Sequence, residues 1–355
     1  MGPSSLVPAF DLAETSVPLL ALSLSGIAAG DAFEVEKFVE ACKTDGGFYL
    51  DLDEVSNRES GTRHHPLFSM AEEIFQVASE VFAMPLQEKS RWEMDQWGDL
   101  QIGGYKPAGK HSGVCRGKRD GFENFLVPLN AIFDINPNPN PRHPQWPSPL
   151  SLRLDLIKEF ETSCQRIALL LLSTLSNILI PPPNIPFQHL HREGQPSTTS
   201  LAILRYLPSA SRASDQVGHM AHTDVGSLTL IFASSAGLQV FRPSTSSWVS
   251  VPPRPGSIFV NVGDSLRFMS GKRLTSCLHR VVPNTGLSGA VAERYSLAFF
   301  QRPELSARFV DSDGREWISE DWHRAKYKIF RADNNEQTST SLLTGKKGFL
   351  GEWQG

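Results

Sequence analysis

Three absences limit what this sequence can encode. The longest uninterrupted apolar run in the middle of the chain, residues 167–172, is far too short to span a bilayer. Residues 1–10 hold neither a basic segment nor a long apolar one, so no secretory signal is expected. The 4 cysteines are scattered without paired spacing, which in a long chain indicates reduced thiols. We therefore expect a cytoplasmic protein without a membrane partner.

An excess of charge is also lacking. The chain holds 34 lysines and arginines against 38 acidic residues, a formal net charge of −4. No long-range basic field attracts a polyanion, so a nucleic-acid partner is not expected, and the substrate is not selected by bulk charge. No feature indicates a protein partner. With 355 residues, 40% of them hydrophobic, the chain can bury a large core.

Two proline-rich segments divide the sequence. Prolines recur through residues 136–149 and 181–186, where they exclude both helices and strand ladders. We expect a helical N-terminal region over 1–135, a linker and long helix over 136–186, a β-rich core over 187–305, and a C-terminal helix with a polar tail over 306–355.

The long helix is predicted from a stripe of residues spaced three or four apart: Leu156, Phe160, Cys164, Ile167, Leu171, Leu175 and Ile178. This spacing is typical of one buried helical face, which we expect to pack against a sheet. Shorter helices are predicted over 32–44, 66–82, 85–92 and 320–330.

Short strands are predicted over most of the remaining chain. They cover residues 48–52, 201–207, 227–232, 238–241, 248–251, 257–262, 278–282 and 294–300. Turn formers separate them at 253–256, 263–264 and 284–289. Many short strands at close spacing are typical of an antiparallel sandwich or jelly roll. The predicted fold class is therefore α+β, a jelly roll covered by a helical N-terminal layer.

A candidate metal site begins at His222 and Asp224. The two residues are two positions apart, so in an extended backbone their side chains share one face. His279, at the start of a later predicted strand, offers a third ligand. Two imidazoles and one carboxylate leave neighbouring coordination positions open, the arrangement used for oxygen activation at iron(II). Structural zinc sites need four protein ligands, usually including thiolates. We expect His222 and Asp224 to lie at the mouth of a site.

Other histidines compete for this role. His64, His65, His189 and His191 lie in polar stretches that we interpret as loops, so they are weaker candidates. His219 lacks the relation that joins His222 to Asp224. We interpret it as a neighbour of the ligands or a surface residue.

Arg294 and Ser296 form a second candidate group. They are two positions apart and share one strand face, so a guanidinium fork and a hydroxyl can bind one carboxylate. The distal carboxylate of 2-oxoglutarate needs such a partner when it is buried. A surface charge is the alternative interpretation of Arg294, and the surrounding apolar residues 295–300 disfavour it.

Taken together, these residues resemble the isopenicillin N synthase-like branch of the iron(II)/2-oxoglutarate-dependent oxygenases. The likeness covers nearly the whole chain, and its motifs occur in the family's order: His222-Thr223-Asp224, Gly263-Asp264, Leu278-His279-Arg280-Val281 and Arg294-Tyr295-Ser296. Parts of the family's N-terminal pattern are found at 38–49, 82–89, 104–105 and 120–125. The resemblance implies a distorted double-stranded β-helix.

The resemblance also implies roles. His222, Asp224 and His279 correspond to the iron ligands, and Tyr206, Arg294 and Ser296 to residues that hold 2-oxoglutarate, which with O2 is the expected co-substrate. Tyr105 and Phe300 are expected at the substrate pocket. Beyond the metal ligands, no further catalytic residue is expected.

The sequence departs from the family at two places. Leu204 stands where many relatives have an asparagine, which removes one hydrogen bond to 2-oxoglutarate. Residues 50–55 lack the usual histidine–glycine pair. The implied activity is oxidation of a small organic molecule by hydroxylation, desaturation or ring rearrangement, as in specialised metabolism. Two alternatives stay open: a same-family oxidase that does not use 2-oxoglutarate, and a non-catalytic ligand-binding jelly roll.

Overall fold

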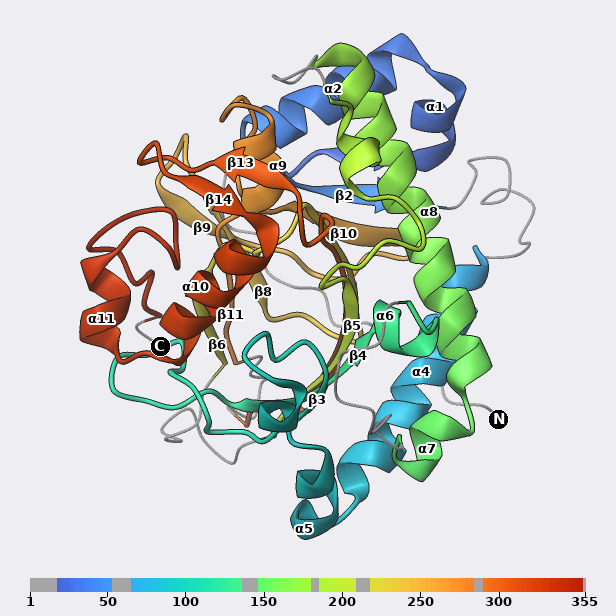
Figure 1. Cartoon of the computed structure of the whole chain (residues 1–355), viewed down its shortest axis with the longest axis vertical. Coiled ribbons are helices and arrows are strands. Elements are labelled where there is room, and N and C mark those ends of the chain that lie inside the picture. Colours follow the sequence, from blue (N-terminus) through green and yellow to red (C-terminus); the bar gives the residue numbers. More distant parts are fainter. Residues whose placement is uncertain are drawn as a thin grey trace.

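The computed structural model describes residues 18–52, 65–135, 146–179, 185–208, 218–283 and 290–353. At its centre, two antiparallel sheets pack against each other, with helices around them (Figure 1). The larger sheet has the order β1 (Ala21–Ser23), β2 (Gly47–Asp51), β10 (Ser257–Val262), β7 (Leu228–Ala233), β12 (Arg294–Gln301), β5 (Ser200–Tyr206), β4 (Phe122–Pro128) and β3 (Gly104–Lys106). Only β1 and β2 pair in parallel among these neighbours.

The smaller sheet has the order β6 (His219–His222), β11 (His279–Val281), β8 (Leu238–Arg242) and β9 (Ser247–Ser250). A separate hairpin joins β13 (Arg308–Val310) to β14 (Glu316–Ile318). The predicted α+β jelly roll is confirmed. Every predicted strand is present, with bounds shifted by one or two residues at most.

The N-terminal region differs from the predicted helical layer. It contributes β1 and β2 to one edge of the larger sheet and β3 and β4 to the other. Short strands such as β1 and β3, with three residues each, have too few positions for an alternating pattern to show. The predicted regions 1–135 and 187–305 therefore share one sheet.

Helix α8 (Leu154–Ile178) runs along one side of the larger sheet, next to α4 (Pro66–Ala83) (Figure 1). The predicted apolar stripe is buried in the middle of the helix. At its ends the prediction was wrong: Ile157 is buried while Leu156 is half-buried, and Ile178 is 44% exposed. A regular step of three or four drifts around a helix over 25 residues, so the ends leave the buried face.

The remaining helical segments cover the ends of the sandwich. They are α1 (Leu24–Ala29), α2 (Ala32–Lys43), α5 (Leu86–Lys89), α6 (Leu129–Ile132), α7 (Ser148–Ser151), α9 (Asp264–Met269), α10 (Ser319–Arg331), α11 (Asn334–Ser339), and 3-10 turns at Ser90–Trp92, Met94–Trp97 and Phe187–Leu190. The helix predicted over 85–92 is thus α5 followed by a 3-10 turn. The turn predicted at 263–264 instead begins α9.

The C-terminal segment is not the polar tail that we predicted. After α11 the chain packs on the smaller sheet, where Leu343 is buried. Arg280 of β11 donates hydrogen bonds to the carbonyls of Gly351 and Glu352 at 2.8 and 2.7 Å. The polar composition misled the prediction, because a few apolar side chains, Leu343 and Phe349, together with backbone carbonyls are enough to make these contacts. Of the predicted breaks at 136–149 and 181–186, residues 136–145 and 181–184 lie outside the described residues, as does the turn at 284–289. Helix α7 begins at Ser148, inside the first break, because a proline fits the first turn of a helix.

Two separate groups of buried side chains result. The larger one lies between the outer face of the eight-stranded sheet and helices α4 and α8. The smaller one lies between the sheets and includes Tyr206, Ile231, Val240 and Ala298, with Phe300 packed against it. Residues of β5 and β12 alternate between the two groups, as the pleat requires. The interior between the sheets is where the candidate residues meet.

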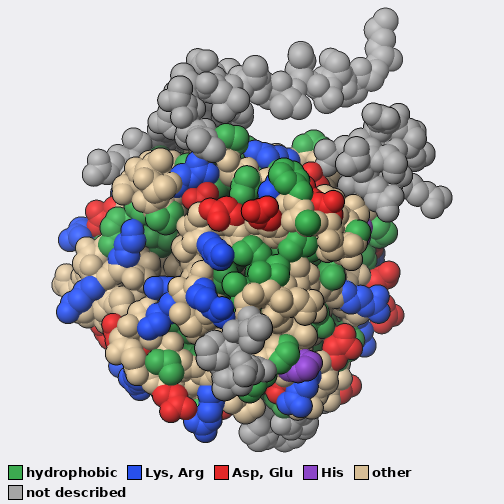
Figure 2. Space-filling model, turned by 90° about the horizontal axis from the view of Figure 1, so that it is seen from above, with side chains coloured by type: hydrophobic (Ala, Val, Ile, Leu, Met, Phe, Trp, Pro, Cys, Tyr) green, Lys and Arg blue, Asp and Glu red, His purple; other side chains and the backbone are tan. Residues whose placement is uncertain are grey.

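All four cysteines are free thiols. Within the described ranges, no helix combines the length and the apolar character that a membrane span needs. Acidic and basic side chains are mixed over the face shown in Figure 2, as the small net charge suggests.

Candidate metal centre

The structure brings His222, Asp224 and His279 together. Strands β6 and β11 pair in antiparallel fashion with His222 directly opposite His279, and Asp224 follows the end of β6. Potential ligand atoms of all three residues lie within 4.8 Å of one another. Asp224 Oδ1 is 3.8 Å from His222 Nε2 and 3.9 Å from His279 Nε2. Residues 55 positions apart in sequence thus form one cluster.

Backbone carbonyls orient both imidazoles. Nδ1 of His222 lies 2.8 Å from the carbonyl of Met220, and Nδ1 of His279 lies 3.0 Å from that of Cys277. A carbonyl only accepts, so each Nδ1 carries the proton and each Nε2 keeps its lone pair. Such outer hydrogen bonds fix the tautomer that binds a metal.

The carboxylate of Asp224 is oriented in the same way. Its Oδ2 accepts hydrogen bonds from the Thr229 hydroxyl at 2.7 Å and the Asn261 amide at 3.2 Å. Oδ1, which faces the two Nε2 atoms, is left available for a metal. Thr229 and Asn261 could not be predicted from the sequence, because their roles depend on β7 and β10 lying side by side.

All three ligands are buried, each only 5 or 6% exposed, so the prediction that His222 and Asp224 lie at a site mouth was wrong. Burial lowers the pKa of His222 to about 3. For Asp224, burial raises the pKa, but His279, His222 and the two hydrogen bonds more than offset it, so the net pKa is lowered. At neutral pH His222 is therefore neutral and Asp224 ionised, the states that bind a cation.

The loop that carries Asp224 is fixed by close backbone contacts. A Cβ on Gly263 would lie 2.2 Å from the Gly226 carbonyl, so only glycine fits there. The N–H of Asp264 donates to the Asp224 carbonyl at 2.9 Å. This explains why a glycine–aspartate pair follows the metal motif in sequence: it packs behind the loop.

Helix α10 closes the loop from the other side. Lys326, fully buried, forms an ion pair with Asp264 and donates to the Thr223 hydroxyl at 2.7 Å. Trp322 donates to the Val225 carbonyl at 3.2 Å. These contacts reach both sides of Asp224, and the sequence analysis missed them because helix α10 is about 100 residues away in the chain.

Two of the competing histidines, His191 and His65, have other partners in the protein. His191 is buried and bonded to the Phe187 carbonyl and the Ser227 hydroxyl, both at 2.7 Å. His65 caps the start of α4, and His64 lies outside the described residues. The ring centroid of His219 lies 4.4 Å from that of His222, so His219 is a neighbour of the ligands, as one of its two interpretations held.

Arg294 and Tyr206 lie opposite each other in the larger sheet, on the face toward the interior. The guanidinium carbon of Arg294 lies 4.8 Å from the centre of the Tyr206 ring. Nε of Arg294 donates to the Ser235 carbonyl at 3.0 Å, but the buried Nη1 has no hydrogen-bond partner among the described residues. Burial lowers the pKa of Arg294. The surface-charge interpretation is therefore wrong, and the side chain suits a buried anion.

Ser296 and Phe300 follow Arg294 on the same face of β12. The Ser296 hydroxyl donates to the Phe232 carbonyl at 3.0 Å, so it must rotate before it can donate to a carboxylate. Phe300 is half-buried at the interior group, opposite Thr229 of β7. Thr229 in turn holds Asp224, which puts Phe300 near the cluster.

Tyr105 is not brought to this group. It pairs with Phe125 on the face of the larger sheet that points to the outer core, and its hydroxyl donates to Glu123 at 2.6 Å. The neighbouring Phe122 points inward, with its ring centroid 5.3 Å from that of Tyr206.

One polar residue of the interior was missed. Asn124 of β4 lies beside Leu204, which lies beside Ser296. Its amide oxygen is buried and has no hydrogen-bond partner among the described residues. Leu204 stands where many relatives have an asparagine. Asn124, on the adjacent strand β4, places a side-chain amide next to that position instead.

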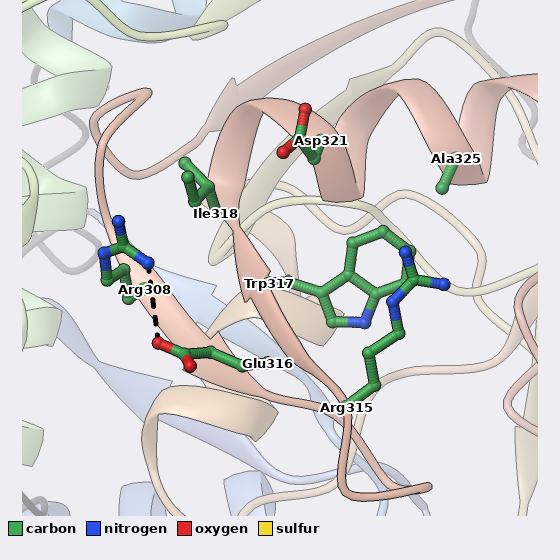
Figure 3. A pocket seen from close by; sticks show the side chains of 7 residues that line it. All are labelled: Arg308, Arg315, Glu316, Trp317, Ile318, Asp321 and Ala325. Atoms are coloured by element: carbon green, nitrogen blue, oxygen red, sulfur yellow. Dashed lines mark ion pairs between the residues drawn. The ribbon is translucent and has the colours of Figure 1, made fainter.

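A groove of about 570 Å³ lies apart from this cluster, on the β13–β14 hairpin and α10 (Figure 3). Arg308 and Glu316 in it pair at 3.5 Å, and Arg315 lies 3.7 Å from the Trp317 ring. Its charged groups largely satisfy one another, and it holds none of the predicted site residues.

The donor set fits iron(II). Two neutral imidazole nitrogens and one carboxylate oxygen face one point, and the other three polar atoms of these side chains are each held by the protein's own groups. No thiolate is near enough to join them among the described residues. This chemistry is typical of iron(II) with open coordination positions rather than of structural zinc.

Comparison with known proteins gives the same family throughout. The family model for the 2OG-Fe(II) oxygenase superfamily matches residues 198–303. A second family model, described as "non-haem dioxygenase in morphine synthesis N-terminal", matches residues 17–149. A 2-oxoglutarate-dependent dioxygenase of Gibberella zeae is 33% identical over 89% of this chain and 88% of its own. Another from Glarea lozoyensis is 35% identical over 93% of each chain.

Solved structures share the fold. A full-length Neurospora crassa protein in complex with alpha-KG has a TM-score of 0.69 and 21% identity, covering 89% of this chain and 98% of its own. A rice dioxygenase for auxin oxidation has a TM-score of 0.60 and 20% identity, covering 92% and 100%. At these identities the likeness concerns the fold alone.

Proposed function

The chain belongs to the 2OG-Fe(II) oxygenase superfamily, and we propose that it oxidises a small organic molecule at the cluster of His222, Asp224 and His279. It is a non-haem iron dioxygenase that uses iron(II), 2-oxoglutarate and O2. The observation that carries the proposal is the convergence of three oriented ligand atoms in the interior between the sheets.

The protein's own groups have distinct roles in this proposal. The Nε2 atoms of His222 and His279 and Oδ1 of Asp224 would hold iron(II), which supplies the activation of O2 at the expense of 2-oxoglutarate. Arg294, Ser296 and Tyr206 would hold the distal carboxylate of 2-oxoglutarate. Apolar walls, including Phe300, keep bulk water from the reacting groups.

The class of reaction is hydroxylation, desaturation or ring rearrangement, in specialised metabolism and in the cytoplasm. A small-molecule substrate is supported by the buried position of the cluster between the two sheets. The Neurospora crassa protein has also been solved with thymine and with 5-formyluracil. The N-terminal strand β4 and helix α10 border the interior and would shape the substrate pocket.

The proposed function predicts that product forms in step with succinate. Purified enzyme with iron(II), 2-oxoglutarate and a panel of candidate metabolites should release about one succinate per product. Proton NMR can follow both compounds in one sample. Full product formation without added 2-oxoglutarate, and without succinate, would instead identify a family oxidase. An Asp224→Ala protein is the control for reactions that need no metal centre.

Asn124 is predicted to contribute one hydrogen bond to 2-oxoglutarate. Asn124→Ala should weaken its binding by about 1–2 kcal/mol, roughly five- to thirtyfold, because one bond to a charged acceptor is lost. Titration of 2-oxoglutarate against the charge-transfer absorption of the iron complex measures this. Asn130→Ala is the matched control, since that amide binds the Ser197 carbonyl. Equal affinities of the Asn124→Ala protein and the parent would assign Asn124 to packing alone.

A further inference from the structure

A second buried arginine lies at the far end of the strand face that carries Arg294. Arg302 follows β12 directly and is only 3% exposed. Its guanidinium carbon lies 4.7 Å from the centre of the Phe300 ring, two positions earlier on the inward face. Nη1 donates to the Ser200 hydroxyl at 3.0 Å and to the Thr198 carbonyl. The inward face of the larger sheet therefore has an arginine at each end.

Arg302 lies against the loop of the metal centre. A Cβ on Gly226, two residues after Asp224, would lie 2.6 Å from Cγ of Arg302. The hydroxyl of Tyr327 faces the guanidinium, and the rings of Tyr327 and Phe330 are 5.7 Å apart. Phe330 in turn lies 5.1 Å from the His222 ring. Arg302 and His222 thus border the same region of helix α10.

Arg302 has no carboxylate partner of its own, which is also true of Arg280 and Arg294, whereas several other buried basic residues have one. Lys106 pairs with Asp120 at 2.6 Å, and Arg242 pairs with Asp45 at 3.1 Å. Nε of Arg302 is buried without a hydrogen-bond partner among the described residues. Burial lowers its pKa, and the one described carboxylate that raises it is the metal ligand Asp224. A buried guanidinium without an anion is costly, so a ligand that supplies one is favoured.

The balance of charge in the proposed complex shows what kind of anion is missing. Iron(II), the Asp224 carboxylate and the Arg294 guanidinium together carry two positive charges. 2-Oxoglutarate, a dianion, neutralises them. The ion pair of Lys326 with Asp264 is neutral by itself. Arg302 then leaves a single positive charge in the buried site, which one monoanionic group balances.

We propose that Arg302 binds a carboxylate of the substrate, so that the enzyme acts on small monocarboxylic acids. The inference rests on the proposed function and adds the substrate class to it. The free Nε edge of the guanidinium suits a carboxylate oxygen, and a lysine cannot reproduce that planar geometry. With its acid group held at Arg302, beside Phe300 and Tyr327, the rest of the molecule extends toward the metal ligands.

Binding measurements test this without knowledge of the natural substrate. The full-length protein is loaded with manganese(II) and saturating 2-oxoglutarate, a complex in which Arg294 is already occupied. Acetate, propionate, benzoate and phenylacetate are then titrated against their primary amides, with the melting temperature as readout. At least one acid should bind about tenfold or more tightly than its amide, and this preference should disappear in Arg302→Gln and return in part in Arg302→Lys.

Arg242→Gln is the matched control, because it removes a buried arginine that has its own carboxylate. It should lower the melting temperature of the ligand-free protein and keep the acid preference. Arg302→Gln should leave the melting temperature of the ligand-free protein unchanged or raised, since it removes an unpaired buried charge.

Two results would overturn the inference: no acid preferred over its amide by the parent protein, or a preference that survives in Arg302→Gln. If the parent protein fails to bind manganese(II) and 2-oxoglutarate at all, the proposed function itself is wrong. If manganese(II) and 2-oxoglutarate bind normally but no acid is preferred over its amide, only the proposed role of Arg302 is rejected.

Discussion

Replacing Arg294 by alanine is expected to weaken 2-oxoglutarate binding about thirtyfold or more, while the affinity for iron(II) barely changes. The side chain is buried, and its Nη1 has no partner among the described residues, so a carboxylate placed there gains a charged hydrogen bond away from water. Losing one partner of such a buried pair typically costs about 2–5 kcal/mol. An exposed pair would cost about 0–1 kcal/mol.

Titrating 2-oxoglutarate against the charge-transfer absorption of the iron complex measures the effect. Arg294→Lys should restore part of the affinity for 2-oxoglutarate, because lysine keeps the positive charge but lacks the planar set of donors of the guanidinium. Ser296→Ala should cost less, about 1–2 kcal/mol, because the hydroxyl already donates to Phe232 and must give up that bond. Affinity equal to the parent's in Arg294→Ala would mean that 2-oxoglutarate is anchored elsewhere.

Replacing His222 or Asp224 by alanine is expected to abolish stoichiometric iron binding. The parent protein should bind one iron(II) per chain, since the described residues hold one cluster of this kind. Loss of outer hydrogen bonds around metal ligands alone typically lowers affinity about 10–100-fold, so loss of a ligand should exceed that range. Elemental analysis after anaerobic reconstitution gives the stoichiometry.

The same variants should also be less stable without metal, since the ligands are buried. Asp224→Ala leaves the Thr229 hydroxyl and the Asn261 amide without their acceptor, at a cost of about 1–3 kcal/mol for each buried group. Asp224→Asn keeps the shape and is the milder variant. His191→Gln, at a buried histidine with two protein partners, should keep full iron stoichiometry. Unchanged iron content in the ligand variants would place the metal elsewhere.

The strands of the core were predictable because their patterns are local. Residues 257–262 are rich in β-branched and aromatic residues and are followed by a glycine, and the structure places β10 at those same bounds. The sheet to which a strand belongs was not predictable. His222 lies opposite His279 only because β6 and β11 pair, and a pairing across more than 50 residues leaves no periodic trace in a single sequence.

The site residues also divide into those that local sequence patterns predict and those that depend on the packing of distant elements. His222 with Asp224, and Arg294 with Ser296, were recognisable because the two residues of each pair lie two positions apart in the sequence. Asn124, Asn261 and Lys326 act through side chains from other elements, so their contribution depends on packing. Tyr105 is the reverse case, a residue that was predicted at the substrate pocket but lies elsewhere. It fits a sequence pattern, but the pleat of β3 turns it to the outer face.

The contacts of the C-terminal segment with the metal loop also have a consequence for biosynthesis. Thr223 is bonded to Lys326 and to the Leu343 carbonyl, residues that a ribosome adds more than 100 positions after the loop itself. Contacts so distant in sequence form late, because the intervening chain must first be made and ordered. A nascent chain that already holds all three ligands still lacks the helix that fixes their loop. We therefore expect firm iron binding only after the residues as far as Leu343 have been synthesised and have packed on the loop.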